Sequence, residues 1–431
     1  MGLIFLQITG PVLRSSQRGS LAPAGDVTQD RRVADGGAAW IMVLVRSVLN
    51  ELADEMERAS PDVLDVNVSQ FYGHTHLALL MRLAPPFTVA DVGLALRVAL
   101  STKGLRVHIT AVDEQELSAG VLPELHHYTV TWHAERFDME SLVSLSQALM
   151  EFGVDVVSSR RLTPLGQSPC WMEYQIAANV KEVDRLQQQL ALVAEQLQID
   201  LALQRDDVQR RAKRLAVFDM DSTLIKTEVI DELAVRAGVG EAVAAITERA
   251  MRGELDFRAS FRERMALLKG LPVSVLQEVA EALPIMDGAA TLMATLKAHG
   301  VKTAIVSGGF MYFAEHVQRM LGIDWVFANT LDVRDGVLTG TVIEPVIDAQ
   351  RKVEIVRQLA ADGGWDLSQV IAVGDGANDI PMLNTVGTGI AFRAKPVVRE
   401  ATRLALSASD LEGVLFLMGL HHRDHATVHA E

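Results

Sequence analysis

Residues 215–223 read LAVFDMDST, an apolar run that ends in two aspartates. A short, uninterrupted apolar run is typical of a strand buried on both faces of a parallel sheet. Asp219 and Asp221 are two positions apart at its end, so both carboxylates can reach one crevice. One carboxylate can attack phosphorus, and the other can transfer a proton. Asp-x-Asp also caps helices and decorates turns, so the string is not decisive by itself.

Three more short apolar runs follow, at residues 301–306, 370–373 and 387–392, with helical patterns between them. Strands that alternate with helices predict an α/β fold, a doubly wound parallel sheet of the Rossmann-like kind. In such sheets the ligand site lies at the carboxyl ends of the strands. Polar residues follow these runs, so we expect their side chains to meet at one edge of the sheet.

Two of these strand ends suit an anionic ligand and a cation. Residues 374–379, GDGAND, offer oxygen ligands that a hard cation prefers, although the same string also fits an ordinary turn. Ser307, Gly308 and Gly309 precede a helix expected from Phe310 and can form a phosphate cradle or simply a helix cap. Lys352, near the start of another expected helix, can neutralise phosphoryl charge or lie on the surface.

The conjunction of these features resembles the haloacid dehalogenase superfamily of phosphohydrolases, over about residues 214–417. The resemblance implies that Asp219 is the nucleophile and Asp221 the general acid and base. It implies Mg²⁺ held by the Asp219 carboxylate, the Asp221 carbonyl and Asp375, with support from Asp379. It further implies that Ser307, the Gly308 amide and Lys352 hold the phosphoryl oxygens and that Asn378 supports metal and phosphate.

Within that superfamily, residues 219–231, 251–272, 306–310 and 374–379 resemble the phosphoserine phosphatase family. The resemblance implies a helical cap at about 226–285, with Glu228 on the substrate ammonium and Arg264 on its carboxylate. Arg262 is the rival for the latter role, and both can instead be solvated members of a charged helix face. Met251 and Phe257 match apolar residues that line the site.

The first 200 residues have a different pattern. Residues 127–204 predict the order β-α-β-β-α-β, and the preceding stretch repeats it in degenerate form. The arrangement resembles tandem ACT domains, which implies a regulatory or assembly role; the alternative is a structural appendage. We therefore expect a first ferredoxin-like α+β domain at 1–115 with an insertion at about 17–37. A second follows at 124–205, and the phosphatase domain at 206–420.

Composition excludes several classes of partner. The 431 residues carry a formal net charge of −15, which argues against nucleic acid and anionic membrane surfaces as partners. Cys170 is the single cysteine and can form neither an intrachain disulfide nor a thiolate zinc site alone. The apolar N-terminus lacks a preceding basic residue and makes a poor signal peptide. We expect a soluble cytoplasmic protein that pairs through its ACT-like domains as a homodimer.

Two charged segments are expected to have no functional role. The basic residues of 205–214 are expected to form a solvated connector or helix end. His421, His422, His425 and His429 are candidate metal ligands near the C-terminus. Apart from Asp424, no cysteine or carboxylate framework surrounds them in the sequence, so we expect a frayed polar tail over 421–431.

The sequence therefore predicts a Mg²⁺-dependent phosphatase whose small-molecule substrate is phosphoserine. The alternative is a phosphatase or phosphotransferase for another small phosphomonoester, such as phosphohomoserine. An amino-acid sensor with a dead phosphatase domain is the third possibility, but all the catalytic side chains that the resemblance requires are present.

Overall fold

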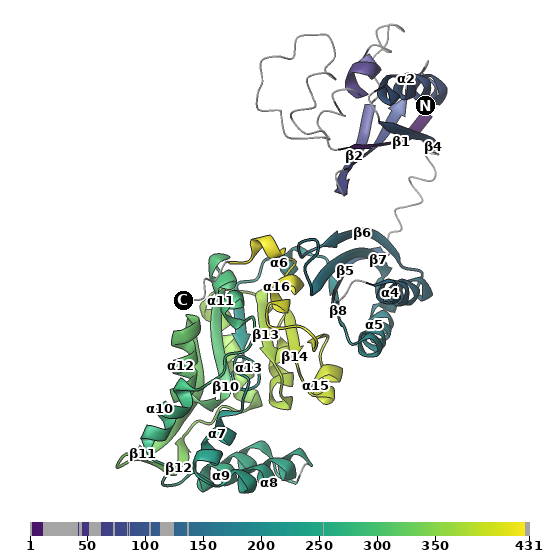
Figure 1. Ribbon diagram of the computed structural model, residues 1–431. Coiled ribbons are helices and arrows are strands. Elements are labelled where there is room, and N and C mark those ends of the chain that lie inside the picture. Colours follow the sequence, from purple (N-terminus) through teal and green to yellow (C-terminus); the bar gives the residue numbers. More distant parts are fainter. Residues whose placement is uncertain are drawn as a thin grey trace, which may run out of the picture. The chain divides into compact units, whose positions relative to one another are not determined.

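The computed structural model (Figure 1) describes residues 2–11, 42, 45–50, 62–71, 74–83, 85, 87–102, 105–112, 125–135, 138–252 and 254–426. The chain divides into two compact units, residues 1–123 and 124–431. The predicted insertion at 17–37 lies outside the described residues. Within the described ranges, no helix has the length and apolar character needed to cross a bilayer.

The first unit is an antiparallel sheet with a helix packed on it. Its strands are β1 (Gly2–Pro11), β2 (Asp62–Phe71), β3 (His74–Leu83) and β4 (Arg106–Val112), in the order β2-β3-β1-β4. Helix α2 (Val89–Ser101) begins with a capping box, in which the side chains of Thr88 and Asp91 each accept the other's backbone N–H. Leu6, Ile8, Leu96 and Leu100 are fully buried in the core between them.

The second unit begins with an α+β lobe, residues 125–205. Its elements are β5 (Leu125–Ala134), α4 (Met139–Glu151), β6 (Asp155–Arg161), β7 (Cys170–Asn179), α5 (Val183–Leu197) and β8 (Asp200–Arg205). The antiparallel sheet has the order β6-β7-β5-β8. Buried Trp132, Ile176, Leu145 and Leu186 join the sheet to the two helices.

The rest of the second unit is an α/β domain around a seven-stranded sheet, in the order β12-β11-β10-β9-β13-β14-β15. The strands are β9 (Leu215–Phe218), β10 (Lys302–Phe310), β11 (Trp325–Arg334), β12 (Val337–Ile343), β13 (Val370–Gly374), β14 (Thr388–Phe392) and β15 (Leu404–Leu406). All neighbours are parallel except β11 and β12. Strand β9 lies between β10 and β13, so the connections on its two sides run in opposite directions along the sheet. In sheets of this kind the ligand crevice lies at the carboxyl ends of the strands, at such a reversal point.

Helices fill the connections of this sheet. The predicted cap region contains α7 (Val229–Arg236), α8 (Gly240–Met251), α9 (Phe257–Leu267) and α10 (Val273–Glu281). The remaining helices are α11 (Ala289–Ala298), α12 (Met311–Leu321), α13 (Ala349–Asp362), α14 (Ile380–Thr385), α15 (Pro396–Ala401) and α16 (Gly413–Leu417). Figure 1 shows α8 and α9 side by side at the end of the domain where β11 and β12 lie.

The α+β lobe and the α/β domain belong to one compact unit, and they are joined by apolar packing that includes Leu162 and Trp171 as well as by polar contacts. The Asp200 carboxylate accepts the backbone N–H groups of Ser407, Ala408 and Ser409 at 2.6–3.0 Å. The guanidinium of Arg210 donates to Glu173 at 2.6 Å and to the Leu417 carbonyl at 3.1 Å.

Two predictions about charged segments are wrong. The basic segment does contain a helix end, α6 (Val208–Arg211), but Arg210 and Lys213 are not solvated: they are buried, at 3% and 6% exposure. The frayed tail is not frayed over its described part, because residues 422–424 form a 3-10 turn, η5 (His422–Asp424). The His422 N–H donates to the Leu162 carbonyl and the Ala426 N–H to the Thr295 hydroxyl, both at 2.9 Å. His429 lies outside the described residues.

The Arg210–Glu173 pair should matter for stability. Replacing Arg210 by Met leaves the 1%-exposed Glu173 carboxylate with only the partly exposed Arg160 as an ion-pair partner among the described residues. Because an uncompensated buried charge is costly, we expect a loss of about 3 kcal/mol in the free energy of unfolding, measured by urea titration. Arg211→Met, on the exposed side of the same short helix, is the control. A loss no larger than that of the control would contradict the assignment.

Candidate active site

The carboxyl end of β9 positions the two aspartates of the opening motif. The Asp219 N–H donates to the Val373 carbonyl at 2.9 Å, which continues the ladder to β13 beyond the end of β9. The Asp219 side chain accepts the Met220 N–H at 2.7 Å, and its residue is only 6% exposed. The backbone thus fixes Asp219 at the crevice where the strand order reverses.

Lys352 lies at the centre of the site. Its fully buried ammonium is 2.9 Å from Asp219 Oδ2 and 2.7 Å from Asp379 Oδ1. Burial alone would lower the pKa of Lys352, but the two carboxylates raise it above its ordinary value, so the side chain stays charged. The interpretation as a surface lysine is therefore wrong, and α13 delivers a fixed positive charge to the end of β9.

Asp219, Asp375 and Asp379 form a carboxylate cluster, with one oxygen of each within 4.8 Å of the others. Burial, with Asp219 nearby, raises the pKa of Asp375 to about 8 and that of Asp379 to about 7. Three carboxylates beside one ammonium leave excess negative charge, which a divalent cation would offset. An all-oxygen donor set fits a hard cation such as Mg²⁺.

Asp221 does not belong to that cluster and contacts the start of α7 in the predicted cap. Its Oδ1 accepts the Val229 N–H at 3.1 Å. A Cβ on Gly309 would lie 2.5 Å from Asp221 Oδ2, so only glycine lets β10 approach this carboxylate. Burial, then Glu228 and Asp219, raise the pKa of Asp221 well above its ordinary value. A carboxyl group that holds its proton in this way is suited to protonating a leaving oxygen.

The end of β10 differs from the prediction but keeps its residues at the crevice. The strand runs through Ser307, Gly308 and Gly309 to Phe310, and α12 begins one residue later than expected. Its pairing with β11 is interrupted between Val306 and Phe310. The Ser307 hydroxyl is fully buried and accepts the Gly309 N–H at 2.9 Å.

Two polar residues that the sequence did not single out support this edge. Asn329, 1% exposed on β11, donates to the Gly308 carbonyl and accepts the Ile347 N–H, both at 2.8 Å. Thr223 donates to Asp375 Oδ1 at 3.2 Å. Thr223 belongs to the motif at residues 215–223, so the sequence offered a signal for it. Asn329 lies on a strand that was not predicted, so the sequence offered none.

Glu228 and Arg264 lie on the cap side of the crevice. Glu228 precedes α7, is exposed, and accepts the Ser222 hydroxyl at 2.8 Å. Arg264 on α9 is half-buried; burial lowers the pKa of its guanidinium, whereas the negative charges of Asp231, Glu228 and Asp221 act in the opposite direction. Its buried Nε has no hydrogen-bond partner among the described residues. Arg262, the rival candidate, is exposed to solvent.

The remaining predicted residues are less informative. Asn378 is half-exposed in the 3-10 turn η4 (Ala377–Asp379), directly before the buried Asp379. The side chains of Met251 and Phe257 lie outside the described part of the structure. The cap also contacts the α/β domain directly, because Arg258 on α9 donates to Asp348 Oδ2 at 3.0 and 2.6 Å. Asp348 is the N-cap of α13, the helix that carries Lys352.

Comparisons with known proteins show which family the chain belongs to. Residues 216–384 match the haloacid dehalogenase-like hydrolase family. The chain is 39% identical over 357 residues to phosphoserine phosphatase SerB2 of Mycobacterium tuberculosis, which covers 82% of this chain and 86% of that protein. It is 42% identical over 249 residues to the phosphoserine phosphatase of Archaeoglobus fulgidus, over 58% of this chain and 72% of that protein. A solved HAD family hydrolase, t0658 of Salmonella enterica serovar Typhi, matches with a TM-score of 0.60 at 32% identity, over 67% and 98% of the respective chains.

The parallel sheet with acidic residues at its reversal point and a helical insertion defines a haloacid dehalogenase-like hydrolase, a phosphoric monoester hydrolase. At the identity and coverage of these relatives, the chain belongs to the phosphoserine phosphatase family. The predicted α/β core and enzyme class are confirmed.

Asp219 should be indispensable for turnover. We expect Asp219→Asn to lower kcat by at least about 10³-fold, because an amide is a far weaker nucleophile than a carboxylate. Phosphate release measures the rate, and circular dichroism checks the fold. Asp362→Asn, an exposed aspartate on α13, is the control and should keep wild-type activity. Substantial turnover by Asp219→Asn would remove this residue from the nucleophile's position.

The carboxylate cluster should make the chelated protein less stable as the pH rises. A carboxyl group whose folded pKa exceeds its unfolded value binds more protons when folded, so stability falls with pH between the two values. With folded pKa values of about 8 for Asp375 and about 7 for Asp379, the thermal midpoint in chelator should fall between about pH 5 and about pH 8.

Mg²⁺ should remove most of that fall, and Asp375→Asn in chelator should flatten it. The measurement is a series of thermal unfolding curves at each pH, with and without the ion. A chelated wild-type protein that is equally stable at both ends of the pH range would contradict the interpretation.

Proposed function

We propose that this enzyme hydrolyses O-phospho-L-serine to L-serine and phosphate, the last step of serine biosynthesis. The observation that carries the proposal is that one cation, Arg264, and one anion, Glu228, lie close enough to influence each other's pKa and are each coupled to an aspartate of the opening motif. An amino-acid phosphate needs one cation and one anion in addition to its phosphate contacts. The names of the relatives in M. tuberculosis and A. fulgidus support the same substrate.

In the proposed first step, an Asp219 carboxylate oxygen attacks phosphorus while Asp221 gives its proton to the departing serine oxygen. The P–O bond to serine breaks, and an aspartyl phosphate remains on Asp219. In the second step, water attacks that phosphorus and gives a proton to the Asp221 carboxylate, while the P–O bond to Asp219 breaks. Phosphate leaves, the Asp219 carboxylate is restored and Asp221 is protonated again. The raised pKa of Asp221 supports its role as the acid.

The phosphoryl oxygens need donors and positive charge. Lys352 is the fixed cation within 2.9 Å of Asp219, and we assign it to the transferring group. Ser307, the Gly308 amide and Asn378 are proposed as hydrogen-bond partners at the same edge. For Mg²⁺, the proposed ligands are Asp219, Asp375 and the Asp221 carbonyl, with Asp379 in support. When bound, the ion would offset carboxylate and phosphoryl charge.

Recognition of the serine part falls to the cap. Arg264 Nε has no hydrogen-bond partner among the residues that the structure describes, and its planar guanidinium suits a bidentate contact with the substrate carboxylate. Glu228 supplies the anion for the ammonium, and desolvation raises its pKa, so a cation nearby would stabilise its charged form. Met251 and Phe257 are proposed to line the apolar wall.

We also propose that the first unit and the α+β lobe are ACT-like domains that bind an amino acid or pair two chains into a homodimer. The element order of the α+β lobe and its sheet order β6-β7-β5-β8 support this assignment. The cytoplasmic location and the absence of nucleic-acid or membrane partners stay predictions from the sequence.

A substrate panel tests the proposed function. Initial rates of phosphate release should be highest for phosphoserine and much lower for phosphothreonine, phosphohomoserine, sugar phosphates and aryl phosphates. The rates should require a divalent ion. A preference for phosphohomoserine or a sugar phosphate would replace phosphoserine as the substrate while keeping the enzyme class.

Within that panel, Arg264→Ala should raise KM for phosphoserine by about 10- to 100-fold, since a charge-assisted pair contributes about 1.5–3 kcal/mol. KM for an aryl phosphate without a carboxylate should change little. Arg262→Ala, two positions away on the exposed side of α9, is the matched control and should leave both values near those of the wild type. Equal losses on the two substrates would remove Arg264 from substrate recognition.

A further inference from the structure

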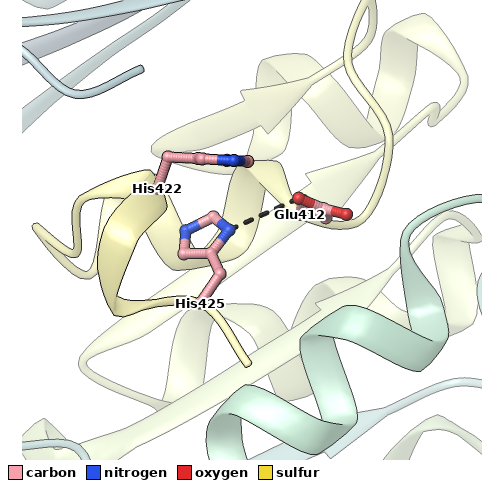
Figure 2. A group of neighbouring side chains, drawn as sticks. All are labelled: Glu412, His422 and His425. Atoms are coloured by element: carbon pink, nitrogen blue, oxygen red, sulfur yellow. Dashed lines mark hydrogen bonds and ion pairs between the residues drawn. The ribbon is translucent and has the colours of Figure 1, made fainter. Parts of the chain in front are cut away.

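A second group of potential metal ligands lies near the C-terminus, away from the carboxylate cluster of the active site. Glu412, His422 and His425 each offer one ligand atom within 4.8 Å of the other two. Figure 2 shows the two imidazole rings one above the other, with the Glu412 carboxylate beside them. We propose that these three side chains form a binding site for a Zn²⁺-class transition-metal ion.

The backbone holds the three residues in place without help from their side chains. Glu412 directly precedes α16, and the Leu411 N–H donates to the Asp287 carbonyl at 3.1 Å. The turn η5 is fixed at both ends by the bonds from His422 to Leu162 and from Ala426 to Thr295. A site whose supporting backbone is already fixed loses little conformational entropy when it takes an ion.

The spacing of Glu412 and His425 fits two ligands of one ion. His425 Nδ1 is 3.4 Å from Glu412 Oε2. Zinc–ligand distances of about 2.0–2.1 Å in a tetrahedron put neighbouring ligand atoms about 3.3–3.4 Å apart. As a direct N–H···O hydrogen bond the same separation is long. The ligand atom of His422 lies within 4.8 Å of the other two.

His425 is held in a buried position beside Glu412. Its side chain is 4% exposed, and Nε2 has no hydrogen-bond partner among the described residues. When the lone pair of a neutral ring is on Nδ1, it faces the Glu412 carboxylate, and a cation or a proton has to lie between the two atoms. Zn²⁺ is a cation that meets this need with the same two ligand atoms.

The donor set selects a different ion from the active site. Two imidazoles and one carboxylate are typical of zinc and its neighbours, whereas Mg²⁺ prefers oxygen ligands throughout. Three protein ligands leave one tetrahedral position for water. The Glu412 side chain is 26% exposed, so the site has access to solvent.

Such an ion would stabilise the contact between the C-terminal turn and the α+β lobe. The His425 ring lies 4.8 Å from the Phe416 ring, and Phe416 stacks on Trp171 of β7 at 4.7 Å. The turn itself bonds to Leu162, also in the lobe. An ion that joins Glu412 to η5 therefore fixes α16 and the turn against the lobe, and its consequence is stability rather than chemistry.

Zinc binding to the full chain tests the proposal. After treatment with chelator, excess Mg²⁺ is added to occupy the oxygen-rich site, and ZnCl2 is titrated calorimetrically. Wild-type protein should bind one more equivalent of zinc than His422→Ala, and zinc should raise its thermal midpoint. His422 is half-exposed, so the variant should fold and melt like wild type without zinc. His421→Ala, its neighbour outside the cluster, should behave as wild type.

Cobalt provides an independent readout. Co²⁺ in a tetrahedral nitrogen and oxygen site absorbs visible light more strongly than in a six-coordinate oxygen site, so wild type should show a band that His422→Ala and Glu412→Gln lack. Phosphate release with Mg²⁺ should be unchanged in His422→Ala. Equal zinc stoichiometry and equal thermal shifts in wild type and His422→Ala, or an equal loss in His421→Ala, would overturn the site.

Discussion

The active site depends on the repulsion between carboxylates that the parallel sheet forces together. Strands β9 and β13 end side by side, so Asp219 and Asp375 cannot separate without breaking the ladder between these strands. Lys352, with its ammonium 2.9 and 2.7 Å from Asp219 and Asp379, offsets part of this charge. The negative charge that remains favours the binding of a divalent ion. The ion and the lysine together can then bind a phosphate dianion. Charge balance thus links metal affinity to substrate affinity in a protein whose overall charge is negative.

The sequence predicted those parts of the site whose residues adjoin a hydrophobic strand. Asp219, Ser307 and Asp375 follow short apolar runs, and a parallel sheet brings the ends of such runs together. Strands β11, β12 and β15 were not predicted. Asp332 and Arg334 interrupt the apolar pattern of β11, and β15 has only three residues. Asn329, which holds the Gly308 carbonyl, was missed for the same reason.

Long-range partners explain the wrong predictions. A basic residue in a charged segment is usually solvated, and nothing local indicates that Arg210 finds Glu173, 37 positions away, at an interface between two lobes. The prediction of a frayed tail at the C-terminal histidines likewise depended only on the residues next to them in the sequence. Glu412 lies before α16 and reaches His425 only because the chain turns back at Gly419, which adopts a positive φ of 79°. Ligands gathered by a turn of this kind are invisible to a search for closely spaced residues.

Helix α9 of the cap contacts the N-terminus of α13, the helix that carries Lys352. Arg258 and Arg264 both belong to α9, six positions apart and on either side of the buried Phe261 in the sequence. Arg258 bonds to Asp348, whose side chain also accepts the Arg351 N–H and caps α13. Lys352 is the next residue on that helix. Arg264, the residue proposed to bind the substrate carboxylate, therefore lies on the same helix as the contact to the N-cap of α13, which carries Lys352. Recognition of the amino-acid part can in this way be coupled to the placement of charge at phosphorus.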